Sequence, residues 1–232
     1  MLRWILLSLL LAARSEAQVP DSGLFQYDLF DKGDHPVGSY HFSIEKRGEL
    51  WLVTSDMDVD TRFLFFKVVL HDHNSFTHDG KQFRAFSMTY FKDVPLQKTL
   101  DQKVDGQLNG LAWSITSQVR DRVISKAFLL DDFQEIRNLV SRFIRPEAVL
   151  RPGESHSTLS LDPLTLTIDP VQSRGLREES VAFQGKVRRL FVMEQKAPDG
   201  DVQVKKFENG LIYRSETAEG YALLKSARTP DF

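Results

Sequence analysis

Histidines gather in one short stretch of the chain, which holds the residues best suited to chemistry. The stretch begins Leu70-His71-Asp72-His73-Asn74 and continues to a third histidine, His78. In a strand, His71 and His73 share one face, and two imidazoles at that spacing can chelate zinc or copper. A third ligand is needed, yet His78 has the opposite parity. The pair is a candidate for metal ligation, but we favour half-exposed strand residues and expect no cofactor.

Two other patterns suggest chemistry without meeting its requirements. Asp56, Asp58 and Asp60 alternate on one strand face, but calcium usually needs a tight loop, so a solvated face is favoured. The run Gly153-Glu154-Ser155-His156-Ser157 only superficially resembles a serine site, because a base meets its nucleophile across the fold. The sequence contains no G-x-S-x-G, H-E-x-x-H or glycine-rich nucleotide motif. We therefore predict no catalytic residues.

Composition narrows the class of protein. The 232 residues contain no cysteine, which excludes thiol catalysis, disulfides and thiolate metal sites. Thirty Lys and Arg stand against 32 Asp and Glu, a formal net charge of −2. This balance disfavours a nucleic-acid partner, which usually requires a basic surface.

The first residues have the pattern of a secretory signal peptide. An arginine precedes the apolar run Trp4 to Ala13, and Ser15 and Ala17 stand at −3 and −1 of a cut before Gln18. We expect residues 1–17 to be removed and 18–232 to form a single β-rich domain. The apolar run is shorter than the roughly 20 residues of a membrane-spanning helix, and charges interrupt every later one, so no transmembrane segment is expected. The favoured location is a Gram-negative periplasm, with full secretion as the alternative.

Alternating polar and apolar residues predict antiparallel strands through most of this domain. Period-two runs such as Tyr40, Phe42 and Ile44 alternate with turn signals. Asp79-Gly80, Asp105-Gly106 and Asn109-Gly110 are hairpin signals, although the last two lie too close to bound a strand between them. Residues 170–180 read as a loop. The fold class is mainly β: a strongly curved antiparallel sheet or open half-barrel of about ten to twelve strands.

One segment, residues 131–144, has helical periodicity. Its apolar residues recur every three to four positions, Asp132 and Glu135 resemble a capping box, and Arg145-Pro146 would end the helix. We predict one main amphipathic helix that covers the sheet.

An unusually apolar stretch suggests a ligand. Residues near 63–70 are apolar on both strand faces, so a helix, a bound acyl chain or a partner must cover the second face. If the helix plugs a concave sheet, the ligand would lie between them; the alternative is a plain two-layer core with no cavity. The predicted ligand-binding residues are Phe63, Phe65, Phe66, Phe86, Met88, Tyr90, Phe133, Ile136 and Val140.

Several stretches resemble a known group of proteins. They are Phe25-Gln-Tyr-Asp-Leu, Pro36 to Ile44, Val59 to Phe65, residues 74–82, and, near the carboxyl end, Gly185 to Val192 and Phe207 to Glu216. The pattern resembles uncharacterised bacterial periplasmic families that are similar to the lipoprotein carriers LolA and LolB. The resemblance implies a curved half-barrel with helical cover and an apolar cavity that holds acyl chains. No catalytic residue transfers, because the matched positions are turns and core residues.

Three functions follow in order of preference. The first is an exported soluble binding or carrier protein that holds an apolar, lipid-like ligand. The alternative is an envelope structural or assembly factor that binds a protein partner through a strand edge or apolar patch. The third is a metal-dependent hydrolase that uses His71 and His73.

Overall fold

The fold is known from a computed structural model, which describes residues 22–63, 66–79, 82–133, 135–136, 150–162, 165–196, 202–208 and 211–228. These described residues form fifteen strands and one short 3-10 helix, η1. The strands are β1 (Ser22–Asp31), β2 (Pro36–Arg47), β3 (Leu50–Phe63), β4 (Phe66–His78), β5 (Phe83–Asp93), β6 (Leu100–Asn109), β7 (Ala112–Val119), β8 (Arg122–Leu129), β9 (Glu135–Ile136), β10 (Ser155–Asp162), β11 (Thr167–Phe183), β12 (Lys186–Lys196), β13 (Val202–Glu208), β14 (Leu211–Glu216) and β15 (Gly220–Arg228).

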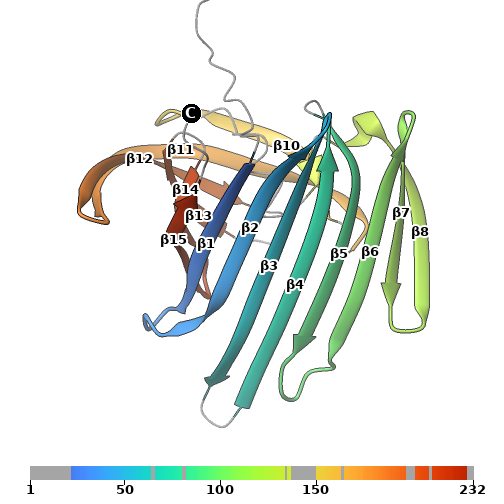
Figure 1. Ribbon diagram of the computed structural model, residues 1–232, viewed down its shortest axis with the longest axis horizontal. Helices are drawn as coiled ribbons and strands as arrows, with labels where there is room; N and C mark the ends of the chain where they lie inside the picture. The colour runs from blue at the N-terminus through green and yellow to red at the C-terminus, as the bar shows by residue number, and fades with distance from the viewer. Residues whose placement is uncertain are drawn as a thin grey trace, which may run out of the picture.

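All fifteen strands belong to one open sheet with a simple order. Strands β1 to β8 follow one another as neighbours, and β1 also pairs with β15, from which the order continues back to β9. The first and last described strands therefore lie together at the centre, while β8 and β9 form the two edges. In Figure 1, β11 and β12 run across the direction of β1–β8, so the sheet curves around its own interior.

Alternation gives strands β1–β7 two unlike faces, while β8 continues the same register but is exposed on both sides along most of its length. On β2, Tyr40, Phe42 and Ile44 are buried, whereas the residues between them are partly exposed. We call the buried face the inner face and the other the outer face. Aromatic pairs cross the inner face, including Phe25 with Phe42, whose ring centroids are 5.2 Å apart. This face packs against side chains of the second half, namely Leu161, Leu166, Leu190 and Tyr213, to form one core.

The predicted amphipathic helix at 131–144 is wrong. Leu130–Asp132 form the 3-10 turn η1, Phe133 has extended backbone at φ −149° and ψ 153°, and β9 pairs parallel with β10. Residue 134 and residues 137–149 lie outside the described residues. Asp132, predicted to cap a helix, instead closes a single turn. Its carboxylate accepts a hydrogen bond from the Leu129 backbone amide at 2.6 Å. In the part of the chain that the structure describes, no helix could cross a membrane.

The expected ten to twelve strands also fall short of the fifteen in the sheet. Residues 170–180, expected as a loop, lie within the 17-residue strand β11. Asp105-Gly106 is not a turn but lies inside β6, whereas Asn109-Gly110 does make the β6–β7 hairpin, with Gly110 at φ +63°. The open curved antiparallel sheet was predicted; its covering helix and strand number were not.

Candidate functional site

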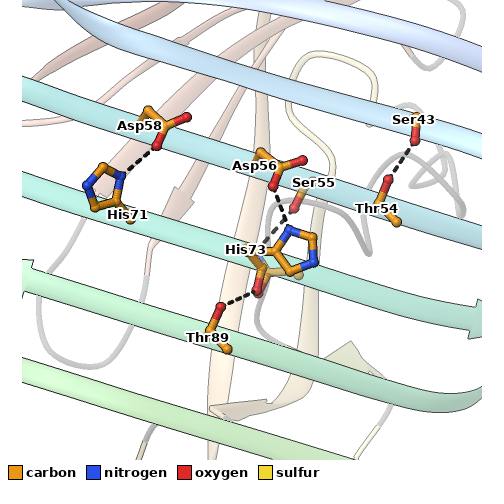
Figure 2. A network of polar contacts seen from close by, with 9 residues as sticks. Ser43, Thr54, Ser55, Asp56, Asp58, His71, His73 and Thr89 are labelled. Atoms are coloured by element: carbon orange, nitrogen blue, oxygen red, sulfur yellow. Dashed lines mark hydrogen bonds and ion pairs between the residues drawn. The ribbon is translucent and has the colours of Figure 1, made fainter.

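His71 and His73 of the sequence cluster lie on the outer face, each against a carboxylate, whereas His78 is buried with its ring 5.1 Å from that of Phe83. His71 and His73 on β4 are the direct cross-strand partners of Asp58 and Asp56 on β3. The Nδ1 atom of His71 is 2.6 Å from Asp58 Oδ1, and that of His73 is 2.5 Å from Asp56 Oδ1 (Figure 2). The strand register therefore produces two parallel His–Asp pairs.

These pairs are exposed and separate. Their four side chains are between 52% and 61% exposed, and the His71 ring also stacks on Phe91 with centroids 6.1 Å apart. Among the described residues, no group of three or more His, Asp or Glu side chains could hold a metal ion. Asp60, the third aspartate of the alternating set, pairs with Lys67 at 2.9 Å. The arrangement is a polar ladder across neighbouring strands.

The predicted ligand-binding residues divide into three groups. Phe86, Met88 and Phe133 are buried in the core, where the Phe86 and Trp113 rings are 5.6 Å apart. Tyr90 is half-buried on the same face of β5. Phe63 and Phe66 are paired in the backbone register at the end of β3 and the start of β4, and Ile136 lies in β9. Phe65 and Val140 lie outside the described residues. Whether any of them contacts a ligand stays a prediction.

A row of buried polar side chains interrupts the inner face. Asn74 on β4 donates to the Ser55 hydroxyl at 3.2 Å, and Gln102 on β6 donates to Ser117 at 2.9 Å. Asp72, beside Asn74 on the same face, has a raised pKa because burial disfavours its charged form. The interior is thus apolar toward one end of the strands and polar toward the other.

A cavity of about 570 Å³ opens at the polar end of the inner face. The β5–β6 loop and the β7–β8 turn frame it, and both lie at the lower end of the sheet in Figure 1. Leu100 and Val119 lie on the inner face of β6 and β7, and Lys92 and Arg122 are their neighbours on β5 and β8. We call this site the rim cavity. Its lining comprises Lys92, Val94, Gln97, Lys98, Thr99, Leu100, Val119, Arg120, Asp121 and Arg122.

The comparisons with known proteins indicate the type of fold but no activity. No family model and no curated protein matches the chain. A crystal structure of a β-barrel-like protein of the domain of unknown function DUF1849, from Brucella abortus, matches 93% of this chain and 100% of its own, with a TM-score of 0.63 and 11% identity. The match supports a β-rich fold shared with an uncharacterised group. It does not extend to the expected likeness to LolA and LolB.

The sequence does not predict the rim cavity. Its cationic residues come from two strands and two connections, and the turn between β7 and β8 carries Arg120-Asp121 instead of an Asn-Gly signal. Only the pairing of β5 to β8 brings Lys92 and Arg122 to one end of the inner face. A weak signal was present, since basic residues recur at consecutive strand ends.

Proposed function

We propose that the protein is an exported binding or carrier protein for one apolar, lipid-like molecule. The observation that supports it is the rim cavity, about 570 Å³ at the inner face of a curved sheet. Small-molecule sites commonly measure roughly 300–1,000 Å³ and occur at the mouths of barrel-like sheets. The aliphatic side chains of Leu100 and Val119 lie in its wall.

Native mass spectrometry of the full chain, purified from the cells that express it, tests this proposal. We expect a bound mass that solvent extraction identifies as an amphiphile. Val119→Glu places a carboxylate in the aliphatic wall and should reduce the bound fraction. Val187→Glu, at a position that is 79% exposed on β12, is the matched control and should not. Extracts without an amphiphile, and no uptake when one is added, would refute the proposal.

Export is a separate part of the proposal, supported by the signal-like pattern of residues 1–17. We expect protein recovered outside the cytoplasm to begin at Gln18. Amino-terminal sequencing after cell fractionation checks this, and a full-length cytoplasmic product would contradict it.

A second function, binding of a protein partner, is favoured by the edge strand β8. Within the described residues, β8 pairs only with β7, so its other edge is open. Val123 and Ile124 on this strand are more than half exposed. An open strand edge with apolar residues can accept a strand from another chain. Val123→Lys should abolish capture of such a partner in a crosslinking experiment without changing amphiphile uptake.

A further inference from the structure

The rim cavity carries an excess of positive charge. Four of its lining side chains are cationic, Lys92, Lys98, Arg120 and Arg122, and one is a carboxylate, Asp121. Within the described part of the chain, none of these four forms an ion pair. Like charges close together repel, so their local field favours an anion.

Basic residues on the outer face behave differently. Lys67 pairs with Asp60 at 2.9 Å, Lys103 with Asp105 at 2.9 Å, and Arg84 with Asp79 at 2.6 Å. Each of these three cations is therefore balanced by a nearby carboxylate. The cluster at the rim cavity has no such balance.

Arg120 is held in place against the cavity at a conformational cost. Its φ of +54° lies in the left-handed region, which is disfavoured for a non-glycine residue. Its Nη2 atom donates to the Thr99 carbonyl at 2.7 Å, which ties the β7–β8 turn to the β5–β6 loop. A guanidinium has five N–H donors, so this contact leaves others for a ligand.

Aliphatic side chains lie beside these charges, next to the buried polar pair Gln102 and Ser117. Leu100 and Val119 lie between Lys92 and Arg122 in the wall of the cavity. Beyond Arg122, Ile124 follows on the inner face of β8, opposite Ser117, and is 54% exposed. An exposed aliphatic side chain beside a cationic cluster suits a molecule with one charged end and one apolar end.

We infer that the rim cavity binds the anionic head, a phosphate or carboxylate, of a single-chain amphiphile, whose chain lies over Leu100, Val119 and Ile124. The inference rests on the proposed function and specifies its ligand class. Lys92 and Arg122 contribute to the positive field of the cavity, and Arg120 donates hydrogen bonds to the head.

Calorimetric titration of the full chain with three eight-carbon probes tests this inference. The probes are octyl phosphate, 1-octanol and octyltrimethylammonium, which share a chain and differ in head charge. We expect octyl phosphate to bind at least tenfold more tightly than 1-octanol, and the cation more weakly than either. Lys92→Gln and Arg122→Gln should each weaken octyl phosphate about fivefold to tenfold and leave 1-octanol within twofold. Lys186→Gln, an exposed lysine on the other half of the sheet, is the charge-matched control and should change neither.

The outcomes separate the inference from the proposed function. Equal affinity for octyl phosphate and 1-octanol, unchanged in both variants, overturns the anionic head but leaves an apolar ligand. Inorganic phosphate that binds as tightly as octyl phosphate overturns the amphiphile in favour of a free anion. Binding to phosphatidylglycerol vesicles without binding to monomeric octyl phosphate overturns it in favour of a membrane surface. Failure to bind any of the probes, with no amphiphile in cell extracts, overturns both proposals.

Discussion

The ring of Phe86 on β5 occupies the space that a side chain on Gly106 of β6 would need. The two residues are direct cross-strand partners, and a Cβ atom added to Gly106 would come within 2.8 Å of Phe86 Cδ1 and closer still to Cε1 and Cζ. Phe86 in turn stacks on Phe76, with centroids 5.9 Å apart. Gly106 is therefore a packing requirement of the inner face.

Gly106→Ala should lower the free energy of unfolding by about 2–3 kcal/mol, because an over-packed core forces side chains and backbone to shift. Urea denaturation measures the change. In a Phe86→Leu background the shorter side chain leaves room, so the penalty of Gly106→Ala should shrink by more than 1 kcal/mol. An equal penalty in both backgrounds would contradict the packing argument. Gly48→Ala is the control, since Gly48 has φ +66° and nothing near its Cβ position, and should cost only about 1 kcal/mol.

The contact between Phe86 and Gly106 also explains why the fold could be predicted only in part from the sequence. Asp105-Gly106 and Asn109-Gly110 look alike as turn signals, and only the position of the Phe86 ring separates a packing glycine from a turn glycine. Strands such as β2 followed from alternation, because one buried face imposes period two, whereas most of β11 was expected as a loop. The apolar spacing around Phe133 also fits a helix, but Phe133 is extended and its ring lies 6.4 Å from that of Trp113. Such long-range contacts carry no local signal.

Leu96 adopts a backbone conformation that is unfavourable for leucine, and no burial of its side chain compensates for this. Its φ is +66°, and the side chain is 95% exposed at the tip of the β5–β6 loop. Leu96→Asn should raise the free energy of unfolding by about 0.5–1 kcal/mol, because asparagine tolerates the left-handed region. Leu96→Ala, which keeps a Cβ atom, should leave stability nearly unchanged. Thermal unfolding of the three proteins compares them, and equal melting temperatures would contradict this account.

The His–Asp pairs of the outer face should contribute little to stability. Exposed ion pairs are usually worth about 0.2–1 kcal/mol, because water and salt screen them. A double-mutant cycle with Asp58→Asn and His71→Asn should give a coupling energy in that range, reduced in 1 M salt. The Lys103–Asp105 pair on the same face, with a 2.9 Å contact, is the reference. Coupling above 2 kcal/mol would contradict the account of an ordinary exposed ion pair.

Elemental analysis tests whether His71 and His73 bind a metal ion. We expect elemental analysis to find the same trace zinc and copper in the wild-type protein and in the His71→Ala/His73→Ala double variant. The reason is that each Nδ1 already faces a carboxylate and that the described residues supply no third ligand. One equivalent of metal in the wild-type protein, lost in the double variant, would restore the metal-dependent hydrolase as a candidate.

Asp72 should favour the folded state more at acidic pH than at neutral pH, because its carboxyl is buried. Burial raises its pKa in the folded state above 3.8, and attraction from neighbouring Asn74 and His73 offsets only part of that effect. The folded state therefore binds the Asp72 proton more tightly than the unfolded state does. As the pH rises from below 3.8 through the folded pKa, the penalty for ionising Asp72 develops, and above the folded pKa it is complete.

Asp72→Asn removes this penalty and should stabilise the protein at pH 7, by about 1 kcal/mol, the ordinary size of a single-site effect. Below pH 3.8 the carboxyl is protonated in both states, so the gain should disappear there. Urea titrations of the wild type and the variant at pH 7 and pH 3 measure the difference. Asp58→Asn on the exposed outer face is the control and should show no such gain at pH 7. If Asp72→Asn instead destabilises the protein at pH 7, the ionised carboxylate has a favourable partner on the inner face, and the burial penalty assigned to it is wrong.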